Sequence, residues 1–489
     1  MPHVEVRWIA VALALSAALA GCSSQLPPVT SRDAAAPDAV DARVEDAPDG
    51  PPPVDREIDG RAVVALVRAT GDELWWVEER LAAIPWRAGV RELGPRRLMR
   101  ARGAEAPRVV FEPPSDERLV SVTAHPSGAW SAVVTNASLG VALVRGDEGG
   151  SVRATVPLDD PALPEDRGAW QGAEPPRSLS LSGRSEDSVR VAADGEDVVV
   201  SLTTQWNSVL LYRWRWSAGA WARGPRTLVS PAAPVEVFIP DTASYDVFDA
   251  IVAPWSTHLC VDEGGAAHVA IWIDYVRLLT HNRVLGTALA LLRGPVPMTS
   301  RPTDILVTRV GRDGARGLQR IVGTPDVDDE PFAIACARGR VAVAGRHRRE
   351  PGRDNTEFHG FAAVLDGAGG AARTLSFDGD ALALAQSVAF DDDGAVLLGG
   401  AEGWTQNPVG VSVGGEGRPF LLRWSGVQGE RAARLSAPAV AGHGELRAIA
   451  VRGGVRWLAG IARGPVTHTW DADRAGLRGD GWIRGLAAR

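Results

Sequence analysis

The feature that most constrains the fold is an internal repeat that runs through most of the chain. Each copy contains an apolar run, a glycine turn, a second apolar run, a variable stretch and a third apolar run. Successive turn glycines are 55 to 75 residues apart. They are Gly71, Gly128, Gly195, Gly264, Gly339, Gly394 and Gly453. A repeat of this length predicts an array of similar units that pack on one another.

The apolar runs are typical of β-strands, because they are short, rich in Val, Ile, Leu and Trp, and bounded by Gly or Asp. The clearest run alternates two sets of side chains: Leu210, Tyr212, Trp214 and Trp216 against Leu211, Arg213 and Arg215. A period of two matches a strand with one buried face.

Three or four such strands per repeat predict one small antiparallel sheet for each copy. Sheets of this kind bury both faces when they are arranged radially, which is the architecture of a β-propeller. Six clear copies and a weaker first copy, around Val63 to Met99, predict seven blades, with six or eight as alternatives. The expected fold class is therefore all-β, with the propeller domain over residues 58–489.

Repeats five to seven resemble the delta-60 class of bacterial propeller repeats. The shared pattern is carried by Asp393-Gly394, by Gly399 and by a later strand from Phe420 to Arg423. The Asp-Gly pair is replaced by Ser127-Gly128, Gly264-Gly265 and Arg338-Gly339 in other repeats. The class has no single activity, so the resemblance implies a fold and no catalytic residue.

The first 21 residues have the layout of a secretory signal. Arg7 precedes an apolar segment from Trp8 to Ala20, and about 13 residues are too few to span a bilayer comfortably. The segment ends in Leu19-Ala20-Gly21-Cys22, which resembles the lipobox of bacterial lipoproteins. The resemblance implies cleavage before Cys22, and attachment of diacylglycerol and an N-acyl chain such as palmitate to that residue. The alternative is an ordinary signal peptide followed by a chance cysteine.

Residues 22–57 are expected to form a disordered tether. The tract is rich in Pro, Ala and Asp, and eight acidic residues against three arginines leave it with a net charge of −5. A flexible chain of this length spans roughly 30–35 Å, which would hold the globular body off a membrane. Ser23-Ser24, with no Asp at the next position, is similar to lipoproteins that are retained in the outer membrane.

Composition excludes several chemistries. The chain has no lysine, so its 52 basic residues are all arginine. Schiff-base chemistry, a lysine general base and a P-loop lysine are therefore excluded. The net charge is −8 and no basic stripe is present, so we expect no nucleic-acid partner.

Cys260 and Cys336 occupy similar places in consecutive repeats. Equivalent positions in neighbouring sheets do not automatically face each other at disulfide distance. We therefore expect two buried free thiols, with a disulfide as the alternative that an oxidising compartment permits.

Three motifs invite a chemical role, and for each the simpler interpretation is preferred. Gly410-Val411-Ser412-Val413-Gly414 matches a nucleophile elbow, but it lies between predicted strands with no helix after it, so we expect a chance match. Asp326–Glu330 and Asp391–Gly394 could offer oxygen atoms to Ca²⁺, but we expect solvated turns. Two histidine pairs flank hairpins and are expected at the rim rather than on zinc: His258 with His268, and His347 with His359.

Tryptophans on predicted strands are expected in the core: Trp75, Trp76, Trp214, Trp216, Trp272, Trp424 and Trp457. The expected loop tryptophans Trp170, Trp255 and Trp404 could stack on a sugar or contact a partner. Cys22 is the single site residue that the sequence assigns, and no catalytic, metal or cofactor residue is assigned.

These patterns favour a membrane-anchored, extracytoplasmic binding or scaffold module at the bacterial cell envelope over an enzyme. The expected partners are the membrane, through Cys22, and an unidentified protein or glycan. The alternative is an envelope hydrolase or lyase with its site in the propeller channel, where paired carboxylates with shifted pKa values would converge.

Overall fold

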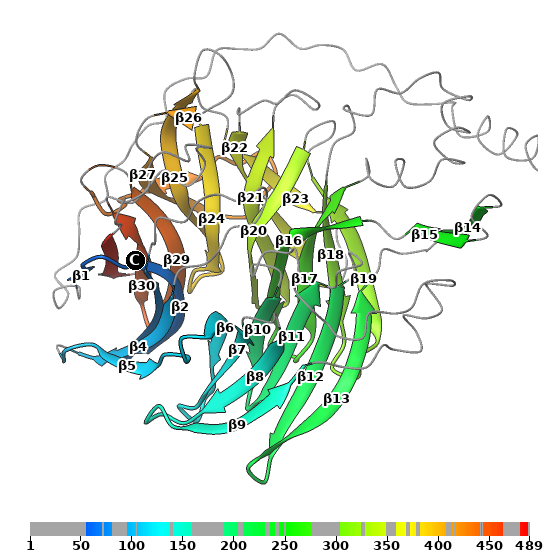
Figure 1. Ribbon diagram of the computed structural model, residues 1–489. Coiled ribbons are helices and arrows are strands. Elements are labelled where there is room, and N and C mark those ends of the chain that lie inside the picture. The colour runs from blue at the N-terminus through cyan, green and yellow to red at the C-terminus, as the bar shows by residue number, and fades with distance from the viewer. Residues whose placement is uncertain are drawn as a thin grey trace, which may run out of the picture. The chain divides into compact units, whose positions relative to one another are not determined.

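The computed structural model describes the parts of the chain that build the blades (Figure 1). These are residues 55–70, 73–80, 95–103, 105–136, 140–158, 189–203, 209–229, 235–239, 244–248, 251–274, 304–323, 328–348, 358–367, 372–377, 382–406, 413–414, 417–440, 442, 444–462 and 480–487. Every regular element in these ranges is a β-strand. A search of the same ranges for a helix with the length and apolar character of a membrane span finds none. The expected signal and Cys22 lie outside them.

Seven antiparallel sheets form the blades of a β-propeller, as the repeat predicted. Blade 1 contains β2 (Ala62–Thr70), β3 (Glu73–Glu79), β4 (Arg96–Arg102) and β5 (Arg108–Phe111). Blade 2 contains β6 (Glu117–Ala124), β7 (Trp130–Asn136), β8 (Val141–Gly146) and β9 (Val152–Pro157). Blade 3 contains β10 (Val189–Asp194), β11 (Asp197–Thr203), β12 (Val209–Ser217) and β13 (Ala220–Val229). Blades 4 and 5 contain β16 (Ile251–Val261), β17 (Ala267–Asp274), β18 (Asp304–Val310) and β19 (Arg316–Val322); and β20 (Asp328–Ala337), β21 (Arg340–Arg348), β22 (Phe358–Asp366) and β23 (Arg373–Ser376). Blade 6 contains β24 (Leu382–Phe390), β25 (Val396–Gln406), β27 (Arg418–Trp424) and β28 (Ala433–Leu435), with the short β26 (Val413–Gly414) paired to β25. Blade 7 contains β29 (Gly444–Arg452), β30 (Val455–Ala462), β31 (Asp480–Ala487) and β1 (Asp55–Ile58), and a separate hairpin of β14 (Val235–Ile239) and β15 (Ser244–Phe248) lies between blades 3 and 4 in the sequence.

The ring is closed by the two ends of the described chain. The first strands of successive blades contact one another, and β29 of blade 7 contacts β2 of blade 1. The outer strand of blade 7 is β1, which pairs with β31, and Figure 1 shows the C-terminus beside it. Residues 55–57, which were expected in the tether, therefore belong to the propeller, because they supply the fourth strand that blade 7 lacks.

Each blade buries both of its faces. On β12, Leu210 and Tyr212 pack against blade 2, whereas Leu211 packs against blade 4. Full burial of such side chains contributes about 1.5–3 kcal/mol each. The alternation therefore reflects two buried faces, each against a different neighbour, rather than one buried face and one solvated face.

In blades 2 to 7 the turn between the first two strands contains a glycine with a positive φ, whereas Gly71 of blade 1 lies outside the described residues. Gly128, Gly195, Gly339, Gly394 and Gly453 all have φ between 60° and 89°. In blade 4 the residue that takes this conformation is Gly265 (φ 78°), one position after the expected Gly264.

A disulfide joins Cys260 of β16 to Cys336 of β20, with their Cα atoms 5.8 Å apart. The expectation of free thiols was therefore wrong. Both cysteines lie on the first strand of their blade, and the first strands of neighbouring blades converge around the axis. Equivalent positions thus meet there.

Candidate functional site

We call the side of the propeller that carries the turns between the first and second strands, and between the third and fourth strands, the hairpin face. Ion pairs on this face connect neighbouring blades. Arg100 bonds Glu148 between blades 1 and 2, and Arg145 bonds Glu196 between blades 2 and 3. Burial alone would raise the pKa of Glu196, but the hydrogen bonds from Ser127 and Arg145 outweigh it and hold that pKa below its ordinary value.

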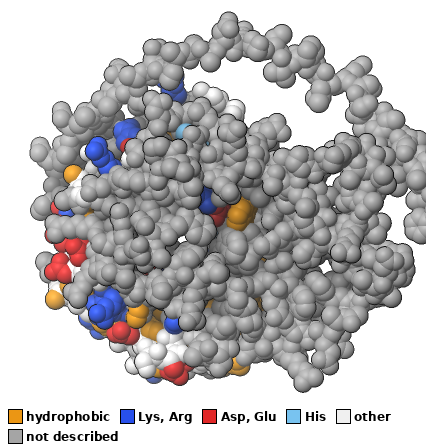
Figure 2. Space-filling model, turned by 45° about the horizontal axis from the view of Figure 1, so that its top comes forward, with side chains coloured by type: hydrophobic (Ala, Val, Ile, Leu, Met, Phe, Trp, Pro, Cys, Tyr) orange, Lys and Arg blue, Asp and Glu red, His pale blue; other side chains and the backbone are white. Residues whose placement is uncertain are grey.

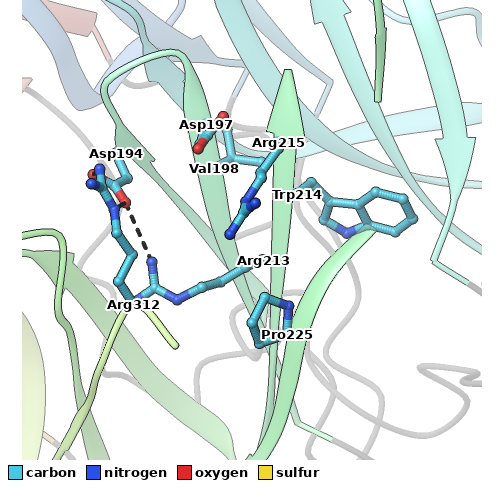
Figure 3. A pocket seen from close by; sticks show the side chains of 8 residues that line it. All are labelled: Asp194, Asp197, Val198, Arg213, Trp214, Arg215, Pro225 and Arg312. Atoms are coloured by element: carbon cyan, nitrogen blue, oxygen red, sulfur yellow. Dashed lines mark hydrogen bonds and ion pairs between the residues drawn. The ribbon is translucent and has the colours of Figure 1, made fainter. Parts of the chain in front are cut away.

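Between blades 3 and 4 the hairpin face contains a cavity of about 330 Å³. Its lining residues come from β10, β11, β12, β13 and the turn between β18 and β19, and all of these except β13 contribute a charged side chain (Figure 3). The lining residues are Asp194, Asp197, Val198, Arg213, Trp214, Arg215, Pro225 and Arg312. Three arginines and two aspartates in one concave site make this cavity the strongest candidate for ligand binding in the described part of the chain.

The length of the β12–β13 hairpin creates one wall of the cavity. Its strands contain 9 and 10 residues, against 6 in each of β8 and β9. The alternation of β12 turns Arg213 and Arg215 to the cavity and Trp214 away from it, as Figure 3 shows. The tryptophan face points to blade 2, where the guanidinium of Arg145 lies 4.6 Å from the ring of Trp216.

A bidentate ion pair forms the opposite wall. Arg312, in the turn between β18 and β19, donates from Nε and Nη2 to the two carboxylate oxygens of Asp194, at 2.8 and 2.6 Å. Arg213 donates to Asp194 at 3.4 Å and to the carbonyl of Gly265 at 2.8 Å. The pKa of Arg312 is raised by its bond to Asp194, whereas burial lowers that of Arg213.

The cavity also contains one cation that the described residues do not neutralise. Arg215 is exposed, and its side chain makes no hydrogen bond or ion pair with any of them. Asp197 accepts the backbone N–H of Trp216 at 3.0 Å through Oδ1.

Two glycines of blade 4 allow the blades to approach at the cavity. A Cβ on Gly265 would lie 2.8 Å from Nε of Arg312 and 2.9 Å from Oδ2 of Asp194. A Cβ on Gly314 would lie 2.8 Å from Cβ of Pro225. Any side chain at Gly265 would therefore displace the ion pair that forms the cavity wall.

The acidic runs match the expected solvated turns only in part: Asp392 and Asp393 are exposed in the turn between β24 and β25, but other members are buried. Asp391 has a side chain only 3% exposed and accepts from Arg456 at 2.7 Å, so this turn links blades 6 and 7. Residues 328–330 open strand β20 rather than a turn, and Glu330 pairs with Arg346 at 2.6 Å. These carboxylates are satisfied by arginine, which is why they tolerate burial.

Three of the four histidines in the two pairs are buried rather than exposed at the rim, whereas His258 is half-buried and its Nε2 donates to the carbonyl of Pro331 at 3.1 Å. His268 is buried and bonds Asp262 at 2.9 Å. His347 and His359 are cross-strand neighbours whose ring centroids are 5.7 Å apart, and Asp329 is the neighbour of His347 on the other side. Asp329, His347 and His359 are all buried, on the face that blade 5 turns to blade 4. No group of three or more potential ligands in the described ranges could hold a metal ion.

The tryptophans and Ser412 are the remaining residues that the sequence singled out. Five of the seven strand tryptophans are buried as expected, while Trp216 and Trp272 are half-buried. Trp255 and Trp404 lie in β16 and β25 rather than in loops. Trp170 and Ser412 lie outside the described residues, and the next described elements after Ser412 are strands β26 and β27.

Two carboxylates of the described first strands pair with arginine. There Glu330 pairs with Arg346, and Glu445 pairs with Arg447 at 2.5 Å. Figure 2 likewise shows acidic and basic side chains side by side where described side chains are visible.

One feature of the sequence indicates the cavity. Arg213 and Arg215 alternate with tryptophans on a predicted strand, which places two cations on one face. Asp194 and Arg312 are 118 residues apart, so no spacing rule could bring them to the same place.

No protein-family model matches this chain, and neither does any curated protein. Solved structures that match include a puromycin-hydrolysing peptidase from Mycobacterium tuberculosis, at 15% identity and a TM-score of 0.40, over 88% of this chain and 53% of the peptidase. A protein of unknown function from Dyadobacter fermentans matches at 10% identity and a TM-score of 0.41, over 88% and 98% of the two chains. The β-propeller domain of the Trilobed protease from Pyrococcus furiosus matches at 10% identity and a TM-score of 0.39, over 84% and 93%. This chain thus spans about half the length of the puromycin-hydrolysing peptidase, and these likenesses concern the fold alone.

Proposed function

We propose that this protein is a lipid-anchored β-propeller that binds a ligand outside the cytoplasm, at the bacterial cell envelope. Cys22 would carry the lipid, residues 22–54 would form the tether, and the propeller would present the cavity between blades 3 and 4. The observation that carries the extracytoplasmic part is the Cys260–Cys336 disulfide, because such bonds persist in oxidising compartments and are rare in the cytosol.

The binding part is supported by the cavity itself. Its charged groups come from rigid strands and tight turns of two blades, which is how propellers present recognition groups without catalysis. Asp262, in the neighbouring turn of blade 4, accepts bonds from His268 and Ala266 that outweigh burial and lower its pKa.

Metabolic labelling tests the anchor. The full chain is expressed in a bacterium with two membranes and given an alkyne analogue of palmitate, alongside a Cys22→Ser variant. We expect label on the wild-type protein in the outer-membrane fraction, and neither label nor membrane retention for Cys22→Ser. Equal labelling of both proteins, or wild-type protein in the cytosol, would overturn the proposal.

A further inference from the structure

We infer that the cavity between blades 3 and 4 binds an oxyanion next to a hydroxyl group, that is, a carboxylate or phosphate on a sugar or polyol. This inference rests on the proposed role as a binding module. It begins with the charge balance of the cavity. Arg312 neutralises Asp194, and Arg213 donates a second, longer hydrogen bond to the same carboxylate. Arg215 faces the same space, and no counter-charge is bonded to it among the described residues.

The two exposed arginines can hold one oxyanion between them. Arg312 uses Nε and Nη2 on Asp194, which leaves its Nη1 for a ligand, and its side chain is 61% exposed. Figure 3 shows the guanidinium of Arg215 directed into the same space from the opposite strand. Planar guanidinium groups match carboxylate and phosphate oxygens in geometry and charge.

The neighbouring acceptor accounts for the hydroxyl group. Asp197 uses Oδ1 on the N–H of Trp216, so its second oxygen can accept a hydrogen bond from a ligand. A volume of about 330 Å³ lies at the small end of ligand sites. Trp214 is among the lining residues but is only 4% exposed, and its indole points away from the cavity, so it offers no face for stacking; this favours a polyol or sugar over an aromatic anion.

Calorimetric titration of the full chain carrying Cys22→Ser tests this inference. The probes are galacturonate and glycerol 3-phosphate, with glucose and glycerol as neutral counterparts. Arg215→Gln removes the unneutralised cation. Arg153→Gln is the matched control, because Arg153 is also an exposed arginine of the hairpin face, paired with Asp147 in blade 2.

We expect at least one anionic probe to bind and its neutral counterpart not to bind. Arg215→Gln should weaken that binding by roughly ten- to hundredfold, since it removes a charge-assisted hydrogen bond, and Arg153→Gln should leave it unchanged. Preference for galacturonate would identify an acidic glycan as the source of the anion, and preference for glycerol 3-phosphate a phosphorylated polyol. Absence of binding by both anions, or equal binding by Arg215→Gln, would overturn the inference without touching the anchor, which the labelling experiment tests alone.

Discussion

Replacement of Cys260 and Cys336 by serine should destabilise the propeller by an amount that the structure defines. The bond closes a loop with a sequence separation of 76 residues. Opening a loop of that length returns about 15 cal/mol/K of chain entropy to the unfolded state, or ~4.5 kcal/mol at 25 °C. The unfolding entropy of a body of roughly 430 residues is about 0.9 kcal/mol/K, so the expected fall in Tm is about 5 °C.

The assay is thermal unfolding of the full chain carrying Cys22→Ser, with Cys260→Ser, with Cys336→Ser and with both. Each single variant breaks the same bond, so all three should lose the same amount rather than add. Alkylation of the denatured Cys22→Ser protein should modify neither Cys260 nor Cys336 without reductant and both with it. Free thiols in the unreduced protein, with an unchanged Tm in the double variant, would refute the reasoning.

Three further predictions concern the packing of the blades. Asp391→Asn should lower the free energy of unfolding by about 3–5 kcal/mol in urea titrations, because it leaves the buried Arg456 unpaired. The control Asp366→Asn, at a half-exposed ion pair, should lower it by only about 0–1 kcal/mol. Equal losses in the two variants would contradict the burial argument. Burial lowers the pKa of His125 below its ordinary 6.5, and its Nδ1 donates to the carbonyl of Gly195, so the folded state holds a neutral ring. The free energy of unfolding should therefore fall as the pH drops from 6.5 towards the folded pKa, and His125→Gln should reduce the slope of stability against pH. An unchanged slope would show that other groups dominate. Deletion of residues 1–58 removes β1 and exposes the edge of β31, so it should cause self-association in size-exclusion chromatography that deletion of residues 1–54 does not; two monomeric products would argue against closure by β1.

Much of the architecture followed from local patterns. Strand positions follow from short apolar runs, and the turns follow from glycines that adopt positive φ, such as Gly128 and Gly394. Both are properties of a few consecutive residues, so sequence alone could predict them. The seven-bladed ring followed because seven similar sheets have no other simple way to bury both faces.

The sequence by itself thus determined the strands, the repeat and the propeller. Only the tertiary structure decided which residues of different blades meet. Cys260 reaches Cys336 because first strands converge at the axis, and Arg312 reaches Asp194 because a turn of blade 4 lies against the hairpin of blade 3. These contacts depend on the relative placement of whole sheets, which alternation and turn chemistry within one blade do not encode.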